Sequence, residues 1–147
     1  MSPIGYRHSY VVTRLNKLFV LRAKNRYEVQ PQNPVALSDI SEPQPDLALV
    51  RSEVVSRAEG LPEPEDTFLI VEIADASLRY DRGRKLRAYA RAGIAELWIV
   101  NLKDNTIEIH REPEGETYRF SRIARGREKV APAAFPDVAV VVEKLIP

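Results

Sequence analysis

The most informative pattern in the chain is a run of apolar residues with one acid inside it. Residues 68–74 read Phe-Leu-Ile-Val-Glu-Ile-Ala, and Glu72 is the charged side chain in this run. Such a run is typical of a central strand that is covered on both faces. Because an ionised carboxylate is costly to bury, we expect Glu72 to be paired with a cation or to bind a metal.

The residues that follow this strand predict a helix and a second strand. A helix is expected over residues 81–92, where Gly93 would end it, and residues 96–100 (ELWIV) form the next apolar run. A strand, a helix and a strand joined by short links predict a right-handed crossover between two parallel strands.

The rest of the chain predicts one amphipathic helix and several shorter strands. Residues 8–24 place apolar side chains at helical spacing, and Asn25 fits the helix stop. Because of Pro31 and Pro34, residues 27–37 are expected to form an edge strand or an interrupted strand pair. Residues 51–66 read as an exposed loop with room for one helical turn. Further strands are expected at residues 47–50, 106–111, 118–124 and 138–142, with the middle two forming a hairpin.

These elements predict an α/β or α+β fold with one mixed sheet flanked by helices, as a single domain over residues 1–147. The sequence has no cysteine, which excludes disulfides, thiolate zinc sites and cysteine nucleophiles. The net charge of +1 means that a nucleic-acid partner would be met by a local basic patch. No apolar run approaches the roughly 20 residues that span a bilayer, and no signal core is present. We therefore expect a cytoplasmic protein that is not bound to a membrane.

The candidate chemistry of the chain is that of carboxylates. Asp46 follows Pro45 at the start of an apolar run, Glu72 lies inside another, and Lys85 lies on the predicted helix. An acid pair and a lysine on neighbouring elements are able to hold a divalent cation and a water. The sequence has no phosphate-binding glycine loop and no G-x-S-x-G motif, and it has 2 histidines, far apart. Carboxylate oxygens select Mg²⁺ or Mn²⁺, which are suited to phosphodiester hydrolysis.

Motifs along almost the whole chain resemble those of a known family. Pro45-Asp46 and Glu72 resemble the split PD…(D/E)XK motif of the restriction-endonuclease-like nuclease superfamily. The further motifs are Met1-Ser2-Pro3, His8, Val71-Glu72-Ile73, the segment from Asp81 to Lys85, Tyr89, and the segment from Gly93 to Val100. The chain is identified by them as a member of the putative restriction endonuclease family of small bacterial proteins within that superfamily.

This resemblance implies a metal-dependent endonuclease that hydrolyses phosphodiester bonds in DNA with Mg²⁺ or Mn²⁺. Asp46 and Glu72 would be metal ligands together with the backbone carbonyl of Ile73. Lys85 would orient the attacking water or stabilise the phosphate charge. His8, Gln30 and Asp81 would support these groups, with Asp81 pairing with Lys85 or capping the helix. The arginines expected to contact nucleic acid are Arg79, Arg82, Arg84 and Arg87.

The chain departs from the family pattern in two places. The superfamily lysine would stand at position 74, where this chain has Ala74. Lys85 on the following helix is therefore expected to replace it. Family members usually carry a segment resembling Y-E-(L/I)-I-D-G-E-L before the MSP motif, and we expect this chain to lack that segment.

Each site residue also has a structural interpretation, and the sequence leaves these open. Asp46 fits a turn acid after proline, and Glu72 fits a buried ion pair with Arg or Lys. Lys85 and the arginines around it fit a solvated helix face, and His8 fits a packing residue. Tyr89 and Trp98 are expected in the core. The alternative function is a nucleic-acid-binding or assembly domain without turnover, and a third is a structural partner protein. Edge strands near the C-terminus allow a homodimer.

Overall fold

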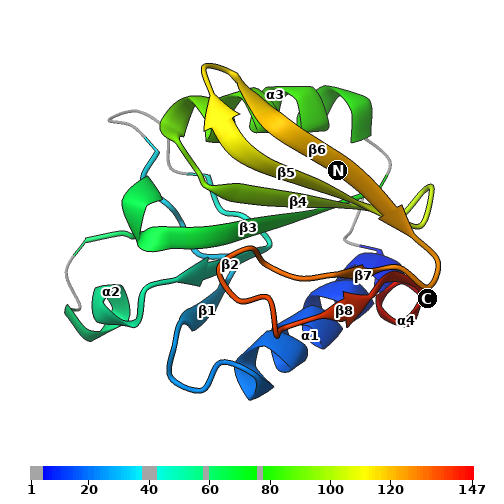
Figure 1. Cartoon of the computed structure of the whole chain (residues 1–147), viewed down its shortest axis with the longest axis horizontal. Helices are drawn as coiled ribbons and strands as arrows, with labels where there is room; N and C mark the ends of the chain where they lie inside the picture. The colour runs from blue at the N-terminus through cyan, green and yellow to red at the C-terminus, as the bar shows by residue number, and fades with distance from the viewer. Residues whose placement is uncertain (1–4, 38–42, 58–59, 76–77) are drawn as a thin grey trace.

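The computed structural model describes residues 5–37, 43–57, 60–75 and 78–147, and the side chains of residues 57 and 78–81 are outside its description. Its centre is a 6-stranded sheet in which the strands lie side by side in chain order (Figure 1). Strands β3 and β4 are parallel, and the other neighbouring pairs are antiparallel. The strands are β1 (Glu28–Pro31), β2 (Leu47–Val50), β3 (Thr67–Ala74), β4 (Glu96–Asn101), β5 (Thr106–Glu114) and β6 (Thr117–Arg125).

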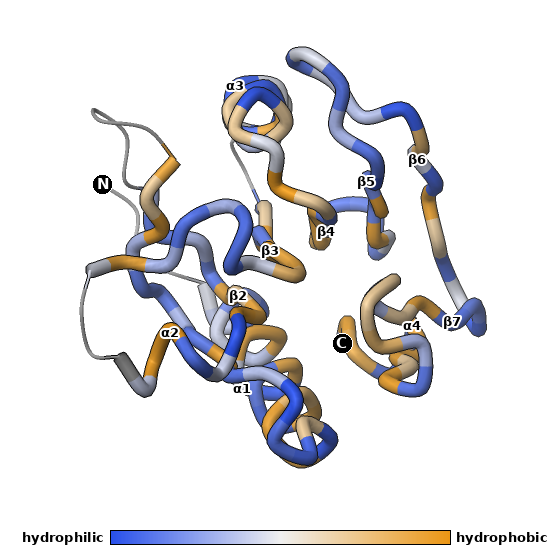
Figure 2. Tube along the Cα trace, turned by 60° about the vertical axis from the view of Figure 1, so that its left-hand side comes forward, coloured by the Kyte–Doolittle hydropathy of each residue, from blue (hydrophilic) through white to orange (hydrophobic). Residues whose placement is uncertain are grey.

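Helices cover both faces of this sheet. Figure 2 shows α3 (Leu78–Ala92) on one side, and α1 (Tyr6–Leu21) with the short α4 (Val142–Leu145) on the other. The helix α1 buries Val11, Leu15 and Phe19 completely, and they pack with alternate residues of β3. Removing each of these side chains from water stabilises the fold by about 1.5–3 kcal/mol. The other face of β3 packs with α3.

The predicted strand–helix–strand unit is confirmed. Ile70 of β3 pairs with Leu97 of β4 in parallel register, and α3 lies between the two strands in the chain. Helix α3 begins three residues before the predicted start at residue 81. It ends before Gly93, whose φ of 85° suits glycine at a helix C-terminus.

The first helix and the strands near it largely follow the predicted pattern. Helix α1 ends at Leu21, before the predicted end at residue 24, because Lys24 and Asn25 take up φ values of 51° and 61°. Strand β1 pairs with β2 alone among the described residues and is an edge strand, so the interrupted-pair alternative is wrong. The predicted loop at 51–66 contains a 6-residue helix, α2 (Ser52–Arg57), and a short 3-10 turn, Pro64–Asp66.

The C-terminal strand expected at residues 138–142 is wrong in extent. Only β8 (Val140–Val141) is extended there, paired with β7 (Lys129–Val130) in a 2-stranded sheet of its own. Val142 then begins α4 instead of continuing the strand. A short run of valines is compatible with both a strand and a buried helical turn, so periodicity alone cannot distinguish these two structures. Among the described residues no helix combines the length and apolar character needed to cross a membrane.

Candidate active site

Glu72 is buried in the sheet face that α3 covers, with 6% of its surface exposed. The Nζ atom of Lys85 lies 3.0 Å from its Oε2, and the hydroxyl of Tyr89 donates a hydrogen bond of 2.7 Å to its Oε1. Both donors come from successive turns of α3. Burial raises the pKa of Glu72, and the charge of Lys85 and the hydrogen bond from Tyr89 oppose this only in part. The sequence expectation that this acid is paired with a cation is met.

Asp46 lies beside Glu72, immediately before the neighbouring strand β2. Because Leu47 pairs with Val71 in antiparallel register, the preceding residue Asp46 is placed next to Glu72, and its negative charge also acts to raise the pKa of Glu72. The backbone N–H of Ile73 donates a hydrogen bond of 2.7 Å to Oδ2 of Asp46. Asp46 is therefore fixed against β3, which a simple turn acid would not be.

His8 reaches the same site from the opposite side of the sheet. It lies in the first turns of α1, and its Nε2 is 3.2 Å from Oδ1 of Asp46. Both side chains are 15% exposed. The two oxygens of Asp46 are thus held by groups from two different elements, β3 and α1.

A pocket of about 330 Å³ opens onto Glu72 and Lys85. Lys85 is half-exposed there, with 46% of its side chain accessible, so its amine is reachable from solvent. Asp46 is not among the described residues of the lining, although its carboxylate acts on Glu72. The described lining residues are Leu37, Pro43, Gln44, Glu72, Arg84, Lys85, Ala88 and Tyr89.

Residues 1–143 match the model of the Uma2 family, which is described as "Putative restriction endonuclease". The chain belongs to the Uma2 family. The sequence resemblance to this family is confirmed. No curated protein is significantly similar to the chain.

Among solved structures, this Uma2 chain is similar to one described as a putative nuclease belonging to DUF820 from Anabaena variabilis ATCC 29413. The TM-score is 0.78 with 13% sequence identity, and the match covers 99% of this chain and 82% of that chain. At this identity the likeness shows a shared fold. The expected nuclease-like mixed sheet flanked by helices is therefore confirmed.

The donor set of this Uma2 site fits a hard divalent cation. No group of three or more His, Cys, Asp or Glu suited to a metal lies within the described parts of the chain. Mg²⁺ is usually held by one or two carboxylates and keeps several of its waters. Asp46 and Glu72 are able to supply these carboxylates. Gln30 is the other residue that was predicted to support the site. It lies on β1, and its buried Oε1 has no hydrogen-bond partner among the described residues. Such an atom costs about 1–3 kcal/mol when it stays unsatisfied, so a water or hydrated ion nearby would relieve it.

The remaining predicted site residues have different environments. Arg82 is not simply a solvated side chain, because its guanidinium group pairs with Glu108 on β5. Arg84 lines the pocket beside Glu72, and Arg87 is exposed. The side chains of Arg79 and Asp81 lie outside the described residues.

Tyr89 is the site residue that sequence reasoning assigned only to the core. It is fully buried, as predicted, yet its hydroxyl binds Glu72 directly. The available signal was its position four residues after Lys85, which places both on one helix face. Trp98 is fully buried and remains a core residue.

Proposed function

We propose that this Uma2 protein is a divalent-metal-dependent endonuclease that hydrolyses phosphodiester bonds in DNA, with Asp46, Glu72 and Lys85 as its catalytic residues. The observation that carries the proposal is the position of Glu72. It is a buried acid that contacts the amine of Lys85 and lines an open pocket, and the strand register places Asp46 beside it. An acid in a cleft whose pKa is shifted by burial and by a specific charge partner is a candidate functional group.

Asp46, Glu72 and the backbone carbonyl of Ile73 would hold the Mg²⁺ or Mn²⁺ ion, with waters completing its shell. When bound, the ion would supply Lewis acidity and a water of lowered pKa. The protein contributes fixed ligands. The N–H of Ile73 and the imidazole of His8 hold Asp46, and the hydroxyl of Tyr89 holds one oxygen of Glu72. Ligands that are held in this way lose little freedom on binding.

Lys85 is suited to act on the phosphate. Its amine lies against the second oxygen of Glu72 and is half-exposed at the pocket, so it can turn to a substrate oxygen without a change of backbone. A cation that is already in place where negative charge develops lowers the barrier without reorganisation. Arg84 in the same pocket offers a further contact to phosphate.

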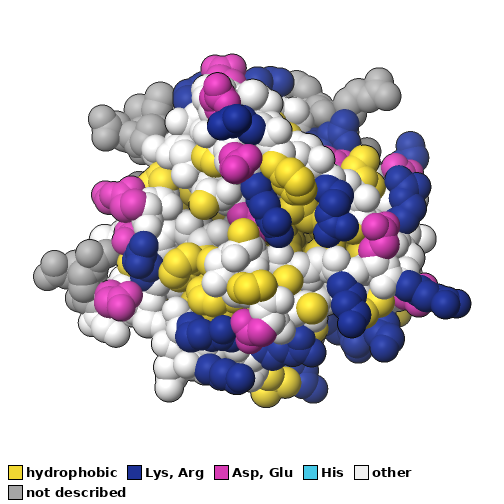
Figure 3. Space-filling model, viewed as in Figure 1, with side chains coloured by type: hydrophobic (Ala, Val, Ile, Leu, Met, Phe, Trp, Pro, Cys, Tyr) yellow, Lys and Arg dark blue, Asp and Glu magenta, His cyan; other side chains and the backbone are white. Residues whose placement is uncertain are grey.

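The basic side chains needed to bind DNA are present on the surface although the net charge is small. Figure 3 shows Lys and Arg side chains over the face that carries β6, β7 and α4 in Figure 1, with Asp and Glu side chains between them. Arg119 and Arg122 of β6 pair with Glu114 and Glu128 there. Neutralisation of phosphates by such residues releases counterions and drives sequence-independent binding.

A metal titration tests the proposal at the acid pair. Mg²⁺ or Mn²⁺ is expected to bind the wild type in calorimetry and to raise its melting temperature by mass action, and plasmid cleavage should require the ion. The double variant Asp46→Asn, Glu72→Gln should show neither effect, whereas Glu116→Gln, an exposed acid, should behave as the wild type. Equal metal binding by the double variant would contradict the proposal.

The second candidate is a nucleic-acid-binding domain without turnover. It is favoured by the contacts already formed at the site, the ion pair of Lys85 with Glu72 and the contact of His8 with Asp46, which suit a purely structural role. DNA binding by a protein that cleaves with neither ion would support this alternative.

A further inference from the structure

A second buried acid lies under the same helix as Glu72. Glu108 on β5 has 6% of its surface exposed. Glu72 pairs with Ile99 of β4, and Ile99 pairs with Glu108, so the three residues form one line across the sheet. Residues aligned in this way point to the same face. Two strand spacings separate the two acids, which is about 10 Å.

Helix α3 binds both acids through side chains on one of its faces. Nη1 of Arg82 lies 2.7 Å from Oε2 of Glu108, and Nζ of Lys85 lies 3.0 Å from Oε2 of Glu72. Arg82 and Lys85 are three residues apart and are neighbours on the helix surface. The two ion pairs therefore connect adjacent turns of α3 with β5 and β3.

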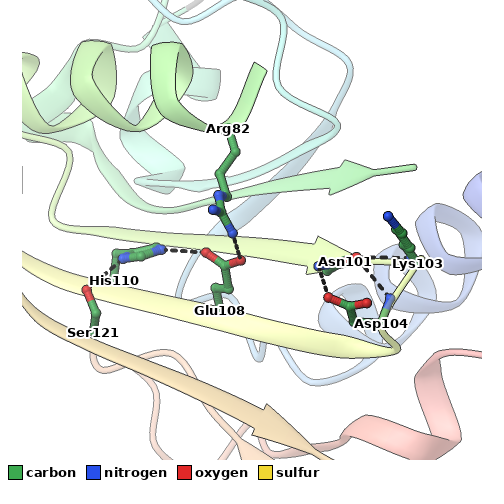
Figure 4. Close-up of polar contacts among 7 residues, drawn as sticks. All are labelled: Arg82, Asn101, Lys103, Asp104, Glu108, His110 and Ser121. Carbon is green, nitrogen blue, oxygen red and sulfur yellow. Dashed lines mark hydrogen bonds and ion pairs between the residues drawn. The ribbon is translucent and has the colours of Figure 1, made fainter. Parts of the chain in front are cut away.

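Glu108 is itself oriented by a chain of hydrogen bonds. Nε2 of His110 lies 3.2 Å from its other oxygen, Oε1, and Oγ of Ser121 lies 2.8 Å from Nδ1 of His110. Figure 4 shows this chain of contacts. Burial alone would raise the pKa of Glu108, but the hydrogen bonds from His110 and Arg82 and the charge of Arg82 hold it below its ordinary value. An ionised carboxylate only accepts, so Nε2 of His110 is assigned as the donor and Nδ1 accepts the proton of the Ser121 hydroxyl. Each oxygen of Glu108 has a donor.

The two halves of α3 are attached to the sheet in different ways. Its C-terminal half is packed through apolar contact, since Tyr89 and Ala90 are buried and Leu86 is partly buried. Before Leu86, Arg82 and Lys85 contact acids of the sheet, and both do so as ion pairs. Among the described side chains, charged contacts therefore help to hold the turn that carries Lys85.

We propose that Arg82 and Glu108 are positioning residues that hold the Lys85-bearing turn of α3 over the active site. This rests on the proposed nuclease function. To act on a phosphate oxygen, the amine of Lys85 has to share or give up its contact with Glu72, and that contact then no longer fastens the helix. The Arg82–Glu108 pair, one turn away, keeps its geometry throughout. His110 and Ser121 serve the same end because they fix the carboxylate that Arg82 binds.

The test combines hydrogen exchange of α3 with cleavage kinetics. Arg82→Ala and Glu108→Gln are compared with Arg82→Lys. The lysine keeps a positive charge at this position and is able to donate the single hydrogen bond that Arg82 gives to Glu108. The matched control is Arg91→Ala, because Arg91 of the same helix forms an exposed pair of 2.7 Å with Glu116. Arg82 is 40% exposed, so Arg82→Ala is expected to fold even where Glu108→Gln does not.

In Arg82→Ala and Glu108→Gln, amides of residues 82–88 should exchange faster, while those of residues 89–92 are unchanged. Turnover should fall by about 10-fold to 100-fold with little change in KM, the range found for residues that orient catalytic ligands. Arg82→Lys should recover most of both effects, and Arg91→Ala should match the wild type.

Two results would overturn the inference. One is unchanged exchange and turnover in Arg82→Ala. The other is a rise in KM alone, which would make Arg82 a DNA contact. If the wild type itself does not cleave DNA, the proposed function fails, and the exchange data decide the helix-holding role separately. Faster exchange confined to residues 82–88 supports that role, and unchanged exchange refutes it.

Discussion

Tyr89 donates a hydrogen bond of 2.7 Å to Glu72, and both side chains are buried between α3 and the sheet. Burial, with the negative charge of Glu72, raises the pKa of the Tyr89 hydroxyl far above its ordinary value, so it stays a donor at every working pH. One oxygen of Glu72 is thereby fixed, and the other is left to Lys85. This contact links the stability of the helix to the geometry of the site.

Tyr89→Phe is expected to destabilise the protein by about 1–3 kcal/mol, because it leaves a buried carboxylate oxygen without its donor. The destabilisation by Tyr89→Phe should become smaller as the pH is lowered, because a protonated and uncharged Glu72 is less costly to bury without a hydrogen-bond donor. Denaturant unfolding at several pH values measures this. Tyr118→Phe is the control, because Tyr118 donates to the neutral carbonyl of Ile94 and its loss should not vary with pH. A penalty for Tyr89→Phe that is constant with pH would contradict the account.

Glu72→Gln is expected to raise the unfolding free energy without metal by up to about 1 kcal/mol. The reason is the sign of the pKa shift. A raised pKa in the folded state means that ionised Glu72 opposes folding at neutral pH, and this penalty disappears as the pH falls. The amide can still accept from Tyr89, and Lys85 is exposed enough to be solvated. Thermal unfolding of the metal-free protein at pH 7 measures the effect. A clearly lower melting temperature would show that Glu72 is mainly a structural ion-pair residue.

Glu108 is expected to give the opposite pH dependence. Its pKa is lowered in the folded state, so its contribution to stability is present above its ordinary range and is lost as the pH falls through the folded value. Glu108→Gln should therefore be less stable than the wild type at pH 7, and the difference should close in acid. The unfolding free energy of both proteins between pH 7 and pH 3 gives the comparison. Glu116→Gln removes an exposed ion pair and should show almost no difference at any pH.

The part of the fold that could be predicted is the part with a long and distinctive pattern. The apolar run at β3, the helix ending at Gly93 and the next apolar run predict the ends of β3 and β4 to within one residue and those of α3 to within three. The run at residues 138–142 was too short to separate a strand from a helical turn, and only the pairing of Val140 with Val130 decides it. A long apolar pattern therefore identifies its secondary structure, whereas a run of five residues does not.

The candidate site was predictable in its acids and not in their partners. Glu72 stands out because it is charged in an apolar strand, Asp46 and Lys85 because they lie on neighbouring predicted elements, and His8 was added by the resemblance. The contacts of Arg82 with Glu108 and of Tyr89 with Glu72 join residues 26 and 17 positions apart. Helical spacing gives the face on which Arg82 and Tyr89 lie, but the group they meet depends on how α3 crosses the sheet. That crossing is a tertiary property with no local signal.

The most direct test of the central claim is single-turnover cleavage of supercoiled plasmid by the wild type, Lys85→Ala and Arg87→Ala in Mg²⁺ or Mn²⁺, with DNA binding measured in Ca²⁺. Loss of a cation that acts on transition-state charge should slow cleavage by about 10²–10³-fold. Lys85→Ala should show this loss with nearly unchanged DNA affinity, whereas Arg87→Ala should weaken binding slightly and cleave at close to the wild-type rate. If Lys85→Ala cleaves as fast as the wild type, or loses only affinity, Lys85 is a phosphate contact and the catalytic assignment is contradicted.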